Sequence, residues 1–281
     1  MDEQRLITWF NAHKRDLPWR ATTPWGVLVS EIMLQQTPVN RVLPIWREWM
    51  ERWPTPRDMA GAPKSEVITR WGRLGYPRRA LRLHECAIAI TNNFGGVVPA
   101  NEEQLRTLPG IGEYTAAAVA SFAYKERALV LDINIRRLYA RHFDGQESPR
   151  PSITKGERAA RAALIPSRNP HIWAAATMEL GALVCTAKNP RCGNCPISDT
   201  CTWRSLDYPQ SQQPKRTQQW HGTDRQCRGV IVQALRENQS LTKSKLLQLW
   251  DVPSQVEKAL ITLLEDGLIE SHKRDSYRLP A

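Results

Sequence analysis

Long apolar runs are missing from this sequence. The first residues, MDEQRLITWFNAHKRDLPWR, contain no apolar core of the length that a signal peptide needs. No other run approaches the roughly 20 residues that a membrane-spanning helix requires. We therefore expect a cytoplasmic protein with no membrane partner. Because cytoplasmic thiols are kept reduced, the six cysteines are not expected to form a disulfide framework.

Strand signals and acidic residues are also scarce. Helical apolar spacing, broken by short Pro/Gly turns, dominates the chain, so we predict an all-α fold. The 28 acidic residues are outnumbered by 39 lysines and arginines, which gives a formal net charge of +11. Such a charge favours a polyanion, nucleic acid first and an anionic membrane second. A soluble basic surface without a polyanionic partner would have the same composition.

The helical pattern begins before Gln35, breaks, and resumes behind Pro38. Thr37 can cap the second helix, and proline is favoured at the first helical position. The helices predicted after this break are Val39–Glu51, Pro63–Trp71, Arg78–Asn93, Asn101–Thr107, Gly112–Tyr124, Asn134–Arg141, Gly156–Leu164 and Ile172–Val184.

The last third of the chain has a different composition. Residues 205–226 are polar, rich in glutamine and poor in aliphatic side chains, which is typical of a linker. The stretches RGVIVQALREN, LTKSKLLQLW and PSQVEKALITLLEDG then predict three short helices, and LIESHKRDSYRLP predicts a hairpin. Three helices and a hairpin outline a winged helix. Its third helix has one lysine against three acidic residues, Glu257, Glu265 and Asp266, which is unfavourable for the major groove. We therefore expect the domain to pack, to bind a protein partner, or to contact DNA weakly through its hairpin.

Four of the six cysteines lie within residues 185–201, in the pattern C-x6-C-x2-C-x5-C formed by Cys185, Cys192, Cys195 and Cys201. Four thiolates at this density can hold zinc or an iron–sulfur cluster. Structural zinc usually uses two Cys-x2-Cys knuckles, whereas this stretch has one, so the spacing favours a cluster. Lys188 and Arg191 lie in the first cysteine loop, where they can contact phosphates.

The stretch LPGIGEYTAAAVASFAY, residues 108–124, places two glycines directly before an alanine-rich helix. Gly110 and Gly112 allow backbone N–H groups to face outward at the helix N-terminus, where they can bind a DNA phosphate. A plain helical hairpin turn would have the same pattern, so this motif alone is only suggestive.

Two carboxyl groups occupy unusual sequence environments. Asp132 follows an apolar run and precedes a helix, so it is first of all a candidate N-cap; it could also stabilise a cationic transition state. Glu31 lies within VSEIMLQQTP (residues 29–38), next to Ile32 and Leu34, and Trp25, Val27 and Leu28 lie just upstream. Burial among these side chains is expected to raise its pKa and to let it act as a general acid. A glutamate on a solvated helix face is the alternative, which the apolar neighbours weaken.

In order along residues 4–205, the motifs LPWR, SEIMLQQT, LGY, LPGIGEYTA, LDINIRR, MELGALVC and the four-cysteine loop resemble those of helix-hairpin-helix DNA glycosylases. The MutY-type adenine glycosylases are the most similar group. The resemblance implies a two-lobed helical fold with a DNA cleft. A six-helix barrel with the helix-hairpin-helix would span residues 18–128, and a cluster lobe would combine 1–17 with 129–209. Residues 210–227 would be a linker, and 228–281 the winged-helix-like domain.

The resemblance also implies roles for the catalytic residues. Glu31 would protonate the adenine at N7, and Asp132, ordered by Asn134, would stabilise the oxocarbenium ion at C1′. Tyr114 occupies the position of the Schiff-base lysine of endonuclease III, so little or no lyase activity is expected. The four cysteines would hold a 4Fe-4S cluster.

Further residues match DNA-contacting positions of the family. Gln36 and Thr37 match a loop that enters the duplex beside the lesion, and Leu74 and Tyr76 match a wedge on the side of the opposite base. These projecting residues would fill the space left by the flipped nucleotide. Two more positions, Trp19 and Arg20, match the lining of the base pocket.

The sequence departs from the family in the pocket, the wedge and the C-terminus. Ala175 replaces the glutamine or glutamate that bonds the flipped adenine, and Pro77 with Arg78 changes the usual wedge sequence GYYSR to GYPRR. Ile133 replaces the glycine after the catalytic aspartate. The usual C-terminal domain that recognises 8-oxoguanine is absent, and the winged-helix-like domain stands in its place.

These features together predict a monofunctional DNA glycosylase of base excision repair that flips and excises a mismatched base. Adenine opposite 8-oxoguanine or guanine is the expected substrate. One alternative is a mismatched or modified pyrimidine opposite guanine; another is a non-catalytic, cluster-containing DNA-binding protein. The expected partner is double-stranded DNA with a mismatch or lesion, bound by a monomer associated with the nucleoid, with a protein partner possible at the C-terminal domain.

Overall fold

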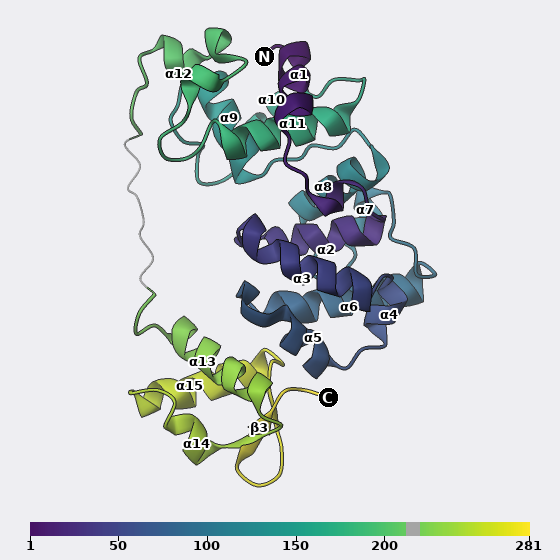
Figure 1. The fold of residues 1–281 in the computed structure, drawn as a ribbon, viewed down its shortest axis with the longest axis vertical. Helices are drawn as coiled ribbons and strands as arrows, with labels where there is room; N and C mark the ends of the chain where they lie inside the picture. Colours follow the sequence, from purple (N-terminus) through teal and green to yellow (C-terminus); the bar gives the residue numbers. More distant parts are fainter. Residues whose placement is uncertain (212–219) are drawn as a thin grey trace. The chain divides into compact units, whose positions relative to one another are not determined.

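The computed structural model describes residues 1–211 and 220–281. Within these ranges the chain is mostly helical (Figure 1). It divides into two compact units. The first unit contains residues 1–27, 100–106 and 111–214, and the second contains 28–99, 107–110 and 215–281. Neither unit is continuous in sequence, so both depend on contacts between distant segments.

The first unit contains the N-terminal helix and the helices around the cysteine loop. Its elements are α1 (Glu3–His13), η1 (Pro18–Arg20), α7 (Glu102–Arg106), α8 (Glu113–Tyr124), α9 (Ile133–His142), α10 (Lys155–Ala162), α11 (Pro170–Leu183), η3 (Cys192–Asn194), η4 (Ser198–Thr200) and α12 (Thr202–Ser205).

Helix α11 is central to this first unit and packs against α1, α8 and α9. Leu6 and Phe10 of α1 share a buried cluster with Leu138 of α9 and with Trp173 and Leu180 of α11. Local signals determine where the helices begin. The side chains of Asp2, Asp132 and Thr154 are the N-caps of α1, α9 and α10, respectively, and each accepts a hydrogen bond from a backbone N–H of its helix.

The second unit joins a helical layer to the C-terminal domain. Helix α2 (Pro24–Leu34) begins in the first unit and lies mostly in the second. The remaining elements are α3 (Val39–Arg52), α4 (Pro56–Ala60), α5 (Lys64–Trp71), η2 (Gly72–Leu74), α6 (Arg78–Asn93), α13 (Asp224–Glu237), β1 (Leu241–Thr242), α14 (Lys243–Leu247), α15 (Pro253–Glu265), β2 (Glu270–Ser271) and β3 (Ser276–Arg278).

The C-terminal domain is a winged-helix-like fold that packs directly on α5 and α6. Its three short strands form an antiparallel sheet in the order β1-β3-β2. Ile68 of α5 and Leu81 of α6 belong to the same buried apolar cluster as the interior of α13 and α15. Arg236 of α13 is half-buried and donates to the carbonyl of Ile68 (3.1 Å). The domain therefore shares a hydrophobic core with the rest of its unit.

The predicted all-α class with a small C-terminal winged helix is confirmed. Most predicted helix limits agree with the structure to within about a turn, which is the usual uncertainty at helix ends. Helix α13 begins at Asp224, inside the segment predicted as a linker, because the Thr223 side chain caps it by accepting from the N–H of Gln226. Part of that segment, residues 212–219, lies outside the described residues. Among the described helices, none is long and apolar enough to cross a membrane.

Candidate active site and cluster loop

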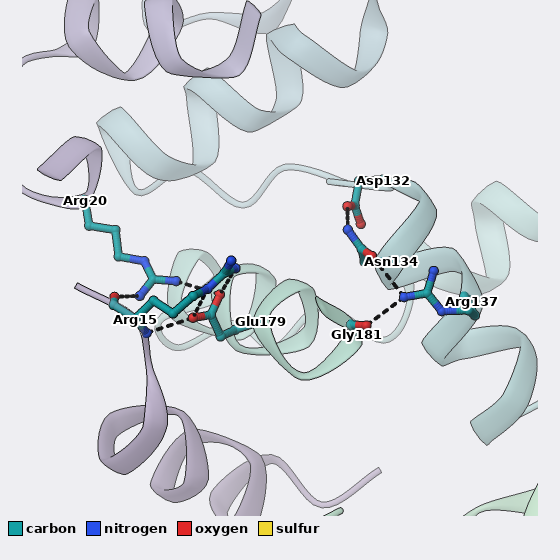
Figure 2. Close-up of polar contacts among 7 residues, drawn as sticks. All are labelled: Arg15, Arg20, Asp132, Asn134, Arg137, Glu179 and Gly181. Carbon is teal, nitrogen blue, oxygen red and sulfur yellow. Dashed lines mark hydrogen bonds and ion pairs between the residues drawn. The ribbon is translucent and has the colours of Figure 1, made fainter. Parts of the chain in front are cut away.

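Asp132 is held at the N-terminus of α9 by two short hydrogen bonds. Its Oδ1 accepts from the backbone N–H of Ile135 (2.6 Å), and its Oδ2 accepts from Nδ2 of Asn134 (2.6 Å; Figure 2). Desolvation by burial raises the pKa of Asp132, and these hydrogen bonds offset only part of that effect. The residue is thus an N-cap, as its position predicts, and also a fixed carboxylate in a low-polarity environment.

Arg137 connects this carboxylate to the cysteine loop. One guanidinium nitrogen donates to Oδ1 of Asn134 (2.9 Å) and to the carbonyl of Gly181 (2.6 Å), and Nε donates to the carbonyl of Cys185 (2.8 Å). Figure 2 shows the part of this path from Asp132 to Gly181. A Cβ on Gly181 would lie 2.7 Å from the carbonyl oxygen of Asn134, so only glycine allows α11 to approach α9 here. Two residues, Arg137 and Asn134, therefore connect Cys185, the first cysteine of the loop, to Asp132 through hydrogen bonds.

Glu179 forms a second buried polar centre in the same unit. It is 1% exposed; Oε1 accepts from the backbone N–H and Nε of Arg15 (2.8 and 2.9 Å), and Oε2 lies 2.7 Å from a guanidinium nitrogen of Arg15 and 3.0 Å from one of Arg20. Burial alone would raise the pKa of Glu179, but the two arginines and their hydrogen bonds lower it overall. Neither Arg15 nor Glu179 is among the predicted site residues. Glu179 nevertheless lies in the apolar motif MELGALVC, and an acid in an apolar run is the same kind of signal that identified Glu31.

One of the residues predicted to line the base pocket, Arg20, belongs to this ion-pair cluster, and Trp19 and Ala175 lie near its members in sequence. Arg20 is fixed by Glu179 and lies 5.1 Å above the Phe10 ring, and Trp19 precedes it in the 3-10 helix η1. Ala175 lies four residues before Glu179 on α11, on the same side of the helix, and is half-buried. Its methyl group offers no hydrogen bond in place of the usual amide or carboxylate.

Glu31 lies in α2 and is buried, with 6% of its surface exposed, as its apolar neighbours predict. Leu28 and Ile32, one turn before it and one residue after it, are 0% and 2% exposed. Glu31 belongs to the second unit and Asp132 to the first. Tyr114 lies in the first turn of α8 in the first unit and is half-buried.

The two loops predicted to enter the duplex are joined by one arginine. Arg79 donates from its guanidinium group to the carbonyls of Ile32, Met33 and Gln35 in the first loop (2.8, 3.1 and 2.6 Å). It also donates to Oγ1 of Thr37 (3.0 Å) and to the carbonyls of Leu74 and Gly75 in the wedge loop (3.2 and 3.0 Å). Desolvation lowers the pKa of Arg79 to about 10, so it stays charged at neutral pH. The sequence analysis did not identify this residue.

The predicted loop residues differ in exposure. Gln36 and Tyr76 are exposed, and both adopt left-handed backbone conformations with φ of 55° and 48°. Thr37 and Leu74 were expected to project, but they are 6% and 4% exposed, because Thr37 donates to the Leu74 carbonyl (3.1 Å) and thereby joins the loops. Arg78, expected at the DNA, is exposed and forms an ion pair with Asp266 of the C-terminal domain (3.1 Å).

The glycine motif has the geometry that its sequence predicts. Gly110 has φ of +77°, and a Cβ there would lie 2.8 Å from Cβ of Arg82. Gly112 is the N-cap of α8, with no side chain to cover the first backbone N–H groups of that helix.

The four cysteines of the loop line a single cavity, together with Leu138, Arg141 and Trp203. Arg141 is 1% exposed; it donates to Sγ of Cys185 (3.4 Å) and to the carbonyl of Thr186 (2.8 Å). Among the described residues, no three His, Cys, Asp or Glu side chains are arranged to hold one metal ion. Four thiols around one cavity form a ligand set that fits an iron–sulfur cluster. Lys188 and Arg191 are exposed on the same loop.

Comparison with known proteins agrees with this geometry. Residues 29–162 match the HhH-GPD superfamily of base excision DNA repair proteins, and residues 185–201 match the iron–sulfur binding domain of endonuclease III. The adenine DNA glycosylase of Mycolicibacterium smegmatis is 48% identical over 269 residues, which cover 94% of this chain and 91% of that protein. The chain belongs to the adenine DNA glycosylase family. Its four-cysteine loop is accordingly a 4Fe-4S cluster site.

Other relatives place the C-terminal domain within this adenine DNA glycosylase family. The Mycobacterium tuberculosis protein is 46% identical over 288 residues, which cover 100% of this chain and 94% of that protein. The match therefore extends through the winged-helix-like domain. The human adenine DNA glycosylase is 38% identical over 210 residues, which cover 71% of this chain and 38% of the human protein.

Solved structures support the same fold. A thermostable thymine-DNA glycosylase has a TM-score of 0.66 at 29% identity, over 72% of this chain and 94% of that one. A trapped covalent complex of endonuclease III with DNA has a TM-score of 0.63 at 21% identity, over 73% of this chain and 95% of that one.

Proposed function

We propose that this adenine DNA glycosylase removes adenine opposite guanine or 8-oxoguanine and leaves an abasic site in an uncut strand. The observation that carries the proposal is the pair of carboxyl groups: Glu31 is buried at 6% exposure, and Asp132 is fixed by two hydrogen bonds of 2.6 Å. DNA binding alone needs neither group. The pyrimidine and non-catalytic alternatives are not favoured, because the relatives at 46–48% identity are adenine DNA glycosylases.

In the proposed mechanism the two carboxyl groups have different roles: Glu31 is the proton donor, and Asp132 stabilises the cation. Glu31 donates its proton to N7 of the flipped adenine, which makes the base a better leaving group as the bond from C1′ breaks. Positive charge then develops at C1′ and on the ring oxygen. The Asp132 carboxylate, held by Asn134 and the N-terminus of α9, stabilises this charge until water adds at C1′. Tyr114 has no amine to attack C1′, so no Schiff base forms.

Other residues bind and orient the DNA. The exposed Gln36 and Tyr76 fill the duplex beside the flipped nucleotide, and Arg79 keeps their loops together. Trp19 lines the base pocket beside Ala175, together with Arg20, which Glu179 fixes. The backbone N–H groups at Gly110 and Gly112, together with Arg78, Lys188 and Arg191, contact phosphates. The cluster bound by the four cysteines stabilises the loop that carries Lys188 and Arg191.

We further propose that the enzyme acts as a nucleoid-associated monomer. The proposed domains are a barrel of residues 18–128 and a cluster lobe of 1–17 with 129–209, followed by the winged-helix-like domain, which begins at α13 (Asp224) and not at residue 228.

A base-release panel tests the proposed function. Purified enzyme is incubated with duplexes that contain A:8-oxoguanine, A:G, T:G and U:G, and abasic sites are scored by strand cleavage with and without alkali. We expect alkali-dependent cleavage of the two adenine duplexes and none of the pyrimidine duplexes. Release of a pyrimidine with adenine untouched would overturn the adenine assignment, and cleavage without alkali would overturn the monofunctional one.

Arg137 gives a test of the path between the cysteine loop and Asp132. Arg137→Met removes the donors to Asn134, Gly181 and Cys185, so Asn134 loses the contact that orients it. We expect the single-turnover rate of adenine release to fall roughly tenfold or more, by analogy with outer-shell substitutions at metal sites, while duplex affinity changes little. Arg127→Met is the matched control, because Arg127 also donates to a backbone carbonyl, that of Ile165, in the same unit. Equal effects of both variants would contradict the path.

A further inference from the structure

The helix that carries Glu31 ends without a cation of its own. The last turn of α2 contains Glu31 and no basic residue. Carbonyl groups in the last turn of a helix have no partners within the helix, and together they carry a partial negative charge. The backbone N–H of Thr37 covers one of them, the carbonyl of Leu34 (3.3 Å). Two others, which directly follow Glu31, accept from a different helix.

Arg79, in the first turn of α6, is the donor to these carbonyls. One terminal nitrogen of its guanidinium group donates to the carbonyls of Ile32 (2.8 Å), Met33 (3.1 Å) and Gln35 (2.6 Å). The positive charge of Arg79 thus lies at the C-terminus of α2, where the helix dipole favours a cation. A residue of α6 therefore caps the helix that carries the proposed acid.

The guanidinium group is itself held in place on a second side. Its other terminal nitrogen donates to the carbonyls of Leu74 (3.2 Å) and Gly75 (3.0 Å) in the wedge loop. Its central carbon lies 5.1 Å from the centre of the buried Trp71 ring. A planar fork can bind α2 with one nitrogen and the wedge loop with the other, whereas a lysine has a single nitrogen for both tasks.

We infer that Arg79 is the positioning residue of the general acid: by capping α2 it holds Glu31 where its proton can reach N7 of the flipped adenine. This inference rests on the proposed function of Glu31. Because Glu31 directly precedes Ile32, unwinding of the last turn of α2 would displace it. Proton transfer requires heavy atoms about 2.6–3.2 Å apart. A misplacement of about 1 Å can lower a rate by about a hundredfold.

A double-mutant cycle with the full-length, cluster-containing protein tests this inference. Arg79→Lys and Arg79→Met are each made in the wild type and in the Glu31→Gln variant. Single-turnover release of adenine is measured on an A:8-oxoguanine duplex by alkali-dependent cleavage. Affinity is measured on the same duplex with 2′-fluoro-deoxyadenosine, which resists excision because fluorine disfavours positive charge at C1′.

Arg236→Met is the matched control for these variants. Like Arg79, Arg236 is a half-buried arginine of the same unit, and it donates to a backbone carbonyl, that of Ile68. Desolvation lowers the pKa of Arg236 to about 10, as it does that of Arg79. The control therefore removes an arginine of similar environment that has no contact with α2.

We expect Arg79→Lys to lower the single-turnover rate roughly tenfold to a hundredfold, and Arg79→Met at least as much. Affinity should fall by a smaller factor than the rate. In the Glu31→Gln background the same substitutions should have little further effect, because an acid that has already been removed cannot be displaced. Arg236→Met should leave the rate unchanged. Thermal unfolding followed by circular dichroism checks that each variant is folded.

Two results would overturn the inference. A rate that falls by the same factor in both backgrounds would mean that Arg79 acts independently of Glu31. A lower affinity with an unchanged rate would mean that Arg79 supports only DNA binding. If Arg79→Met does not fold, Arg79→Lys, which keeps the charge, decides between these outcomes. Failure of the proposed function is distinguishable, because the wild type would then release no adenine, or Glu31→Gln would release it at the wild-type rate.

Discussion

Replacement of Asp132 by asparagine is expected to reduce the single-turnover rate of adenine release by about a hundredfold to a thousandfold. Asparagine is a good N-cap, so helix α9 should still begin at the same residue. The variant nevertheless has no negative charge to stabilise the cation that develops at C1′. Duplex affinity should change little, because the lost interaction matters mainly in the transition state.

The same substitution should change stability in a direction that the raised pKa of Asp132 determines. Because burial raises this pKa above its ordinary value of 3.8, the folded state favours the protonated form. The stabilisation that protonation provides is complete at low pH and is lost as the pH rises through the folded-state pKa. At pH 8 the ionised carboxylate therefore destabilises the folded state, and the neutral asparagine removes this destabilisation.

We accordingly expect Asp132→Asn to unfold at a higher temperature than the wild type at pH 8, and this difference to shrink as the pH is lowered through the raised pKa toward the ordinary value of 3.8. Thermal unfolding at several pH values, combined with the release assay at pH 8, measures both effects. Near-normal release by a well-folded Asp132→Asn variant would remove Asp132 from the mechanism. A stability difference that grows at low pH would contradict the direction of the pKa shift.

Glu31→Gln is expected to lower the rate of adenine release by about a hundredfold to ten-thousandfold, the usual contribution of a general acid. Glutamine has nearly the same size as glutamate, so the buried position among Leu28 and Ile32 should be filled as before. The amide cannot transfer a proton to N7 of adenine. Binding of the lesion duplex should therefore persist while base release is lost.

The matched control for this variant is Glu85→Gln, which changes an exposed glutamate of α6 in the same unit. Gel-shift titration on A:8-oxoguanine duplexes measures affinity, and alkali-dependent cleavage measures release. If Glu31→Gln released adenine as fast as Glu85→Gln, the general-acid role would be untenable. Loss of binding in Glu31→Gln alone would show instead that the buried carboxyl supports the fold.

Local sequence signals predicted the features that depend on neighbouring residues. The limits of α6, Arg78–Asn93, follow from apolar spacing and the proline before it, and the N-cap at Asp132 follows from a short polar residue before a helix. The cysteine spacing identified the cluster loop in the same way. These signals lie within a few residues of the feature that they specify.

Features that depend on distant residues could not be predicted in this way. Glu179 accepts from Arg15, 164 residues away, and no local pattern links the two. Arg79 joins two loops mainly through their backbone carbonyl groups. Because every residue has such a carbonyl, the sequence does not indicate which residues Arg79 binds. Thr37 and Leu74 have opposite polarity but are both buried, because each loop covers the other. The docking of the C-terminal domain on α5 and α6 likewise depends on complementary surfaces.

The discontinuous first unit has a consequence for biosynthesis. Helix α1 leaves the ribosome early, but its partner α11 follows only after most of the chain has been translated, as the 164-residue separation of Arg15 and Glu179 shows. At the usual elongation rates, that interval is roughly 8 to 33 s. Throughout it, Leu6 and Phe10 have no native surface to cover them, and the nascent N-terminus is a candidate ligand for ribosome-associated chaperones. Iron loading is later still, because Cys201 follows α11.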